Sequence, residues 1–424
     1  MMTLILLAAT AVIWVAVGNP RALLHREDRI TVVWVFFVAA WPFIIGYLVG
    51  PLIWVSSDQA GRVSSALLYA PGAICSLVAL VRGLREPRVQ ISLPAALIGT
   101  LLLFSAVAVW FSGLVQVLNF MMAGALFMGV VLKRGVTPVR TLSVTALVSL
   151  AAISAAVTLA VIVNPGRVVA DCRVDKCGIT GQALTSPFAA NGNLLGIATV
   201  LLIPFACASL TLWRCLVLLA GVGAVQLVAM SRTAMFALVT VSVALLLIKV
   251  SKTSQWRLRA AFTALAVGFC GSVIPLFVNF SGSSYSGRGY LWQAGRDAIG
   301  QAPVFGHGPS YWYLIAKTAL FDANYSPHNG WYDVLVAMGA WGVLVIVAGV
   351  IVQLSTTARA AVPYLVTYYA CVLSLNMDES VYVPYFLGIL PVAALLPLML
   401  YDQKPAADRE LEANLVAFDR AGSE

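Results

Sequence analysis

The chain has 424 residues, of which 61% are hydrophobic and only 10% are charged, and this composition excludes an ordinary water-soluble domain because so much apolar surface could not be buried. Its apolar runs are about twenty residues long, which suits helices crossing ~30 Å of hydrocarbon and not the shorter alternating strands of a barrel. The net charge of +9 arises mostly from Lys and Arg in short loops between these runs, so it indicates membrane orientation and not nucleic-acid binding.

The first apolar run spans 1–17, and basic residues follow it without preceding it, which predicts a retained anchor with its N-terminus outside. Further runs lie at about 30–55, 64–81, 91–111, 114–132, 141–163, 193–213, 215–231 and 260–280, with another ending at the basic stretch from Lys249. Three more begin near Gly330, Ala360 and Val381. We therefore predict an all-α, polytopic membrane domain over 1–400 with twelve or thirteen spans, followed by a cytoplasmic tail at 401–424.

Alternation of the basic loops places the loop at 164–192 and the larger loop at 281–328 on the outer side of the membrane. Cys172 and Cys177 lie in the first of these loops, within the sequence DCRVDKC. They are close enough to form a disulfide if that loop faces an oxidising compartment. The other five cysteines lie within apolar runs.

Polar residues gather between Gly287 and Gly342, in and after the larger outer loop. Arg288 is flanked by two glycines, and it either pairs with Asp297 or Asp322 or binds a ligand. Arg296 follows eight residues later and shares its face if this segment is helical. Guanidinium groups on one face suit a phosphate or pyrophosphate, because they stay ionised and bind its oxygens in a fork.

A third arginine, Arg232, stands in an otherwise uncharged stretch between Cys215 and Ile248. It either snorkels from a helix end or faces a polar cavity. Nearer the C-terminus, Asp378 and Glu379 form an acidic pair in a predicted outer turn. These two carboxylates are either solvated or orient a histidine or an arginine.

His328 directly precedes an apolar run on the predicted outer side, and its imidazole can exchange a proton near neutral pH. In the simpler alternative, His328 and Asn329 only cap the next helix. Gly339 and Gly342 lie within that helix, and we expect them to allow close packing against another helix.

These residues resemble the bacterial O-antigen ligase and polymerase family, a set of polytopic glycosyltransferases. The resemblance covers about 160 residues. Its motifs are SPFAANGNLLG from Ser186, SR at Ser231, GRGYLW from Gly287, APVFGHGP from Ala302, and HNG from His328 followed by GAWG.

The resemblance implies a GT-C-like enzyme that moves a glycan from an undecaprenyl-pyrophosphate carrier to an acceptor hydroxyl. The acceptor is a glycan or glycolipid, and the reaction occurs at the outer, periplasmic face of the bacterial plasma membrane. No nucleotide sugar, metal ion or other cofactor is expected, and the partners are the carrier, the acceptor and membrane lipids. Whether the enzyme is a ligase or a polymerase stays open.

The same resemblance assigns residues to roles. Arg232 and Arg288 are expected to bind the pyrophosphate, and His328 is expected to act at the acceptor or the leaving group. Four further residues are expected to contact substrate: Arg296, Asn329, Asn193 and Glu379. A transporter or flippase of lipid-linked glycan is the alternative function, since many uncharged spans also describe those proteins. A non-catalytic scaffold for envelope assembly is a third possibility.

Overall fold

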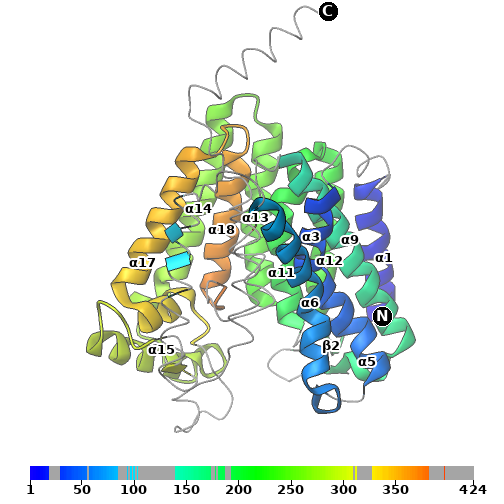
Figure 1. The fold of residues 1–424 in the computed structure, drawn as a ribbon, viewed down its shortest axis with the longest axis horizontal. Coiled ribbons are helices and arrows are strands. Elements are labelled where there is room, and N and C mark those ends of the chain that lie inside the picture. The colour runs from blue at the N-terminus through cyan, green and yellow to red at the C-terminus, as the bar shows by residue number, and fades with distance from the viewer. Residues whose placement is uncertain are drawn as a thin grey trace, which may run out of the picture.

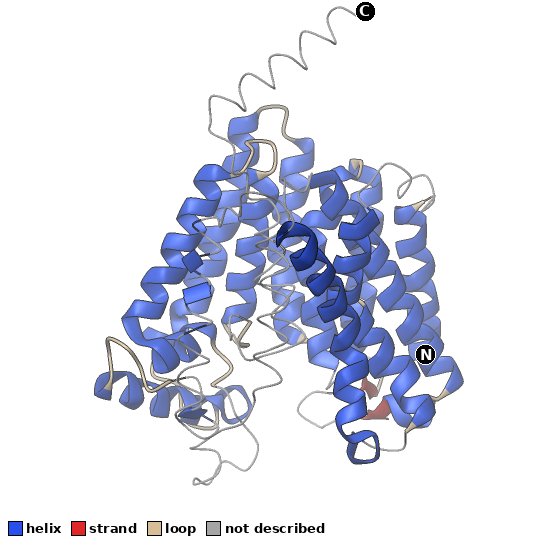
Figure 2. Cartoon of the chain, in the orientation of Figure 1, coloured by secondary structure: helices blue, strands red, loops and turns tan. Residues whose placement is uncertain are grey.

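The computed structural model describes residues 1–18, 29–54, 57–84, 139–172, 177, 180–186, 192–308, 311–312 and 327–381, with isolated positions at 93, 96–97, 99–100, 103 and 396. Nearly all of this part is helical (Figure 2). Within it, six helices are long and apolar enough to cross a membrane, or seven if one bent pair counts as a span. This confirms the predicted all-α, multi-pass architecture. The predicted runs at 91–111, 114–132 and from Val381 lie largely outside the described residues.

The N-terminal part begins with α1 (Met2–Val17), α3 (Arg29–Ala39) and α6 (Ser57–Leu84). Between α3 and α6 the chain forms α4 (Trp41–Phe43), the π-helical η1 (Ile44–Val49) and α5 (Gly50–Ile53). The predicted run at 30–55 is therefore a broken span, bent by 42° between 31–39 and 41–53. Pro42 lies in the first turn after the bend, where a proline is tolerated because that turn does not require its missing N–H.

A β-hairpin follows the next span, α9 (Val139–Val163), and the short α10 (Pro165–Val168). Its strands β1 (Val169–Asp171) and β2 (Gln182–Leu184) pair antiparallel, with Asp171 opposite Gln182. The structure bridges Cys172 to Cys177, a pairing that the sequence left open. Arg167 donates to the backbone oxygens of Pro51 and Trp54, at 2.8 and 3.0 Å, and so anchors the base of the hairpin.

The core is built around α11 (Gly192–Ala206), which continues into the 3₁₀ turn η3 (Cys207–Ser209). Almost every residue of α11 is buried, as expected for a helix that is apolar on all faces. It packs against α9, α12 (Leu212–Ala229), α13 (Arg232–Val250) and α18 (Val362–Asn376). The helices α13 and α18 also pack against α14 (Ser254–Phe277), and α1 packs against α9 and α12.

Two further helices flank this core. The first, α15 (Ser284–Gln301), lies near the same end of the helix bundle as the β-hairpin (Figure 1). It occupies 284–301 of the predicted loop at 281–328, so this part of the predicted loop is helical. The second, α17 (Gly330–Thr356), packs against α14, α15 and α18.

Helix α17 is broken at Gly339, which has φ 64° and ψ −162°. The loop at 302–308 fills the break and makes four backbone hydrogen bonds with α17. The loop donates from His307 N–H to the Val336 oxygen and from Gly308 N–H to the Ala337 oxygen. The helix donates from Ala340 N–H to the Pro303 oxygen and from Trp341 N–H to the Val304 oxygen. The expectation that Gly339 allows two helices to pack closely is wrong. Gly339 instead leaves room for the backbone of the loop, because a Cβ at this position would lie 2.3 Å from the Val304 oxygen.

Candidate functional site

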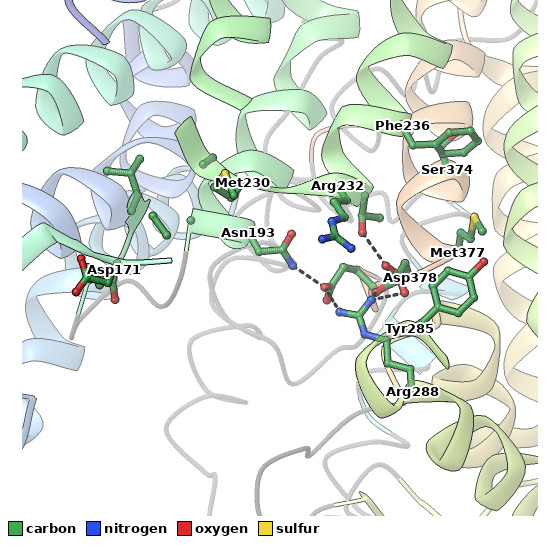
Figure 3. Close-up of a pocket in the computed structure, with 18 residues that line it drawn as sticks. Asp171, Asn193, Met230, Arg232, Phe236, Tyr285, Arg288, Ser374, Met377 and Asp378 are labelled. Carbon is green, nitrogen blue, oxygen red and sulfur yellow. Dashed lines mark hydrogen bonds and ion pairs between the residues drawn. The ribbon is translucent and has the colours of Figure 1, made fainter. Parts of the chain in front are cut away.

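A pocket of about 560 Å³ lies where the β-hairpin, the start of α11, the α12–α13 turn, α15 and the end of α18 meet. Four residues selected from the sequence line it: Arg232, Arg288, Asn193 and Glu379. They come from four separate segments of the chain, so the tertiary fold brings them together. Figure 3 shows Asp171 of the hairpin at one end of the pocket and the α15 and α18 residues at the other.

Arg232 is the first residue of α13, and its side chain extends into the pocket towards Asp378 and Arg288 (Figure 3). The helix begins there because the Ser231 hydroxyl accepts a hydrogen bond from the Ala234 N–H, at 3.3 Å. A helix N-terminus carries partial positive charge, so α13 and Arg232 both favour an anion at this place. Of the two sequence-based alternatives, the structure favours an arginine facing a polar cavity.

Arg288 extends from α15 and is only 13% exposed. Its guanidinium contacts the Asp378 carboxylate, donates to the Asp378 backbone oxygen at 2.6 Å and donates to Glu379 Oε1 at 2.9 Å. Burial by itself lowers the pKa of Arg288, but the two carboxylates outweigh it and raise that pKa. Arg288 thus pairs with Asp378 and Glu379 and not with Asp297, one of the two partners that the sequence suggested. The other, Asp322, lies outside the described residues.

Glu379 is the common acceptor of the site. Its Oε1 accepts from Arg288 and, at 2.5 Å, from Asn193 Nδ2, while its Oε2 lies 3.0 Å from His328 Nδ1. Burial opposes ionisation of Glu379, but the hydrogen bond and charge of His328, with Arg288 and Asn193, outweigh it and lower its pKa. Both carboxylate oxygens therefore serve to hold other site residues, although we expected Glu379 to contact the substrate.

Asn193 extends this network to the arginine on α13. Its Oδ1 accepts from the Ser231 hydroxyl at 2.5 Å, and Ser231 caps the helix that begins with Arg232. A continuous chain of hydrogen bonds thus joins the cap of α13 to Glu379 and onward to His328. Because each member restrains the next, the arrangement is preorganised.

The sequence identified Asp378 only as one member of an acidic pair with Glu379. Its Oδ1 contacts Arg288, and its Oδ2 accepts from the Thr233 hydroxyl at 3.2 Å. Burial raises the pKa of Asp378 by more than Arg288 lowers it. The two neighbouring carboxylates therefore have pKa values shifted in opposite directions, a pattern that often marks functional acids.

Backbone strain is concentrated at this site. Among the described residues, three non-glycine positions have positive φ: Met230 at 59°, Tyr285 at 52° and His328 at 52°. Met230 and Tyr285 line the pocket beside the two arginines, and His328 contacts Glu379. Such conformations are unfavourable for side chains with a Cβ and cluster at functional sites, where the surrounding structure holds them. No short-range sequence signal indicates this strain.

Three of the expected site residues are not among those that line the pocket: His328, Arg296 and Asn329. His328 is joined to the pocket through its contact with Glu379 Oε2. Arg296 donates to the Tyr332 hydroxyl at 3.0 Å and to the Pro275 backbone oxygen at 3.3 Å. Asn329 is fully buried and accepts hydrogen bonds from Trp331 N–H and Tyr332 N–H. Asn329 therefore caps α17, as in the simpler alternative that the sequence offered, and both Arg296 and Asn329 stabilise the fold around α17.

The fold and the pocket define a multi-pass, all-α membrane protein with an arginine-rich pocket at one end of its helix bundle. Comparison of the chain with protein-family models, curated proteins and solved structures finds no match. The chemistry of the pocket itself is therefore the basis for a functional assignment.

Proposed function

We propose that this protein is a membrane glycosyltransferase that transfers a glycan from an undecaprenyl-pyrophosphate carrier to an acceptor hydroxyl. This is the activity of the O-antigen ligase and polymerase family that the sequence motifs resemble. In this proposal the pocket faces the outer side of the bacterial plasma membrane, where the carrier lies in the bilayer and its glycan extends into the periplasm.

The observation that carries the proposal is the meeting of Arg232 and Arg288 in one pocket, from helices distant in the sequence. When the glycosidic bond of the carrier breaks, negative charge develops on the pyrophosphate oxygens. Two guanidinium groups in the pocket stabilise that charge more in the transition state than in the ground state, and this difference accelerates the reaction. The partial positive charge at the start of α13 acts in the same direction.

His328 supplies the proton chemistry in this proposal. A proton on Nδ1, donated to Glu379 Oε2 at 3.0 Å, leaves Nε2 as the acceptor nitrogen of the neutral ring. That tautomer can take the proton from an acceptor hydroxyl as its oxygen bonds to the anomeric carbon. The carbon–oxygen bond to the phosphate breaks, and the pyrophosphate leaves with the electron pair. Alternatively, a protonated His328 donates to the leaving oxygen, as the resemblance also allows.

The test is glycan transfer by purified protein reconstituted in vesicles with a lipid-linked glycan and its acceptor. We expect Arg288→Ala and His328→Ala to reduce transfer at least a hundredfold, the usual scale for losing a charge-stabilising or proton-transferring group. Arg257→Ala is the matched control, because Arg257 donates to the Ser251 backbone oxygen away from the pocket. Unchanged transfer by both folded variants would show that the site is wrongly assigned.

The same vesicles distinguish the alternative function. Translocation of labelled lipid-linked glycan without formation of a new glycosidic bond would indicate a transporter or flippase. Transfer by the purified single chain would exclude a purely structural scaffold. The acceptor that supports transfer, either core lipid or a growing lipid-linked chain, would separate a ligase from a polymerase.

A further inference from the structure

The lining of the pocket carries no excess of positive charge before any ligand enters it. Arg232 and Arg288 contribute two positive charges, and Asp378 and Glu379 contribute two negative charges. These four groups sum to zero, and Asp171 at the other end of the pocket adds one further negative charge. A pyrophosphate diester carries two negative charges, so its binding leaves the pocket with uncompensated negative charge. Such charge is costly in a partly buried site, and a proton is the simplest compensation.

Glu379 is poorly suited to take up that proton. Both of its oxygens are acceptors for Arg288, Asn193 and His328, and protonation would weaken these contacts. Its lowered pKa reflects the same contacts, which outweigh the effect of burial. Glu379 therefore stays ionised while it holds the other site residues.

Asp378 is in a different position. Its carboxylate has Arg288 as its charged partner and the Thr233 hydroxyl as a neutral donor. A phosphate oxygen that engages Arg288 competes with Asp378 for the same guanidinium and brings negative charge close to it. Burial already disfavours the ionised form of Asp378 and raises its pKa. Anion binding increases that penalty.

The charges around Asp378 favour its ionised form less once an anion is bound. The groups near Asp378 are Arg232 and Thr233 from α13, Arg288 from α15 and its neighbour Glu379, which in turn bonds to His328. Asp171 from β1 adds a negative charge at the other end of the pocket. The two arginines become shared with the phosphates, whereas Glu379 remains negative. Protonated Asp378 can in addition donate a hydrogen bond to a phosphate oxygen, which its ionised form cannot do.

We propose that Asp378 takes up a proton from solvent when a pyrophosphate group binds at Arg232 and Arg288, so that anion binding in this pocket is coupled to protonation. The inference rests on the proposed function only in taking a pyrophosphate as the ligand of the two arginines. Asp378 then acts as a positioning residue: it holds Arg288 in the empty pocket and releases it to the phosphates on protonation. Release of the carrier pyrophosphate after transfer returns the proton to solvent.

The test is calorimetric titration of the full chain, in lipid nanodiscs, with a symmetric dialkyl pyrophosphate diester whose own charge is constant across the pH range used. Titrations in buffers of different ionisation enthalpy give the number of protons taken up. At neutral pH we expect uptake of about one proton and a Kd that rises by up to about tenfold per pH unit. In Asp378→Asn we expect uptake to fall by about one proton and the Kd to lose its pH dependence.

Asp171→Asn is the matched control, because Asp171 lies on the hairpin at the other end of the same pocket and its loss removes the same charge. It should leave the proton uptake unchanged. Thr233→Val provides a second variant that keeps the carboxylate and removes the hydroxyl donating to it. Its binding should begin to weaken at a higher pH than in the wild type, because the ionised carboxylate is less stabilised.

The outcomes separate this inference from the proposed function. Diester binding without proton uptake, or an unchanged uptake in Asp378→Asn, overturns the role of Asp378 and leaves the pyrophosphate site standing. An unchanged pH dependence of binding in Thr233→Val counts against that role as well. No binding of the diester to the wild-type chain, with the protein folded, overturns the pyrophosphate site itself and the inference with it. Loss of about one proton in Asp378→Asn but not in Asp171→Asn supports the inference.

Discussion

Replacing Gly339 by alanine should destabilise the contact between the loop at 302–308 and the broken helix α17. Gly339 has φ 64° and ψ −162°, a combination that is essentially restricted to glycine. An added Cβ would lie 2.3 Å from the Val304 oxygen and 2.4 Å from its carbonyl carbon. These are backbone atoms, so no side-chain rotation relieves the clash, and the loop must move away.

The size of the effect follows from two contributions. Holding a residue with a Cβ in this conformation costs about 1–3 kcal/mol. Moving the loop endangers its four backbone hydrogen bonds to α17, each worth about 1 kcal/mol net. If half of these bonds are lost, the total is about 3–5 kcal/mol. The loop directly follows α15, so the same change should loosen the helix that carries Arg288.

The measurement is thermal unfolding in detergent, combined with hydrogen exchange of the amides at 302–308 and 336–341. We expect a lower unfolding temperature and faster exchange in both segments. Gly300→Ala is the control, because nothing lies within 4 Å of its added Cβ and it lies within α15, where alanine is the better helix former. Unchanged exchange and unfolding in Gly339→Ala would refute the view that the loop holds the break open.

Three further predictions concern the charged network. Because the pKa of Glu379 is lowered below its ordinary value of 4.5, its ionised form stabilises the fold above that pH, and this contribution is lost as the pH falls through the lower folded value. Unfolding temperatures of Glu379→Gln should therefore depend less on pH in that acidic window than those of the wild type, and an unchanged dependence would contradict the network. Asn193→Ala removes the links to Ser231 and Glu379, so it should cost about 2–3 kcal/mol of stability in denaturant unfolding without changing any charge. Arg288→Lys keeps the charge but loses the planar fork, and should weaken diester binding at least tenfold, whereas Arg257→Lys should bind as the wild type does.

The sequence predicted the class of fold because run length and charge distribution depend on local composition. The run predicted at 141–163 is α9 at 139–163, and the turn at Ser231 separates two apolar helices as expected. The bend within the run at 30–55 was not predicted, because hydropathy does not distinguish one straight span from two helices at an angle.

The candidate site was predicted only in part. Arg232, Arg288 and Glu379 were selected by residue type and motif, and the structure brings them together at one pocket. Arg296 and Asn329 were selected by the same reasoning, yet they stabilise α17 and lie outside the pocket. Residue type shows what a side chain can bind, but the packing of its neighbours decides whether a ligand can reach it.

By itself, the sequence determined that this chain is a helical membrane protein and that its arginines, histidine and carboxylates are unusual among long apolar runs. Only the tertiary structure decided that Arg288 pairs with Asp378 and Glu379, and that Gly339 receives a loop in place of another helix. The physical reason is that these contacts join segments distant in the sequence. Their geometry depends on how whole helices pack, and no local pattern of residues specifies it.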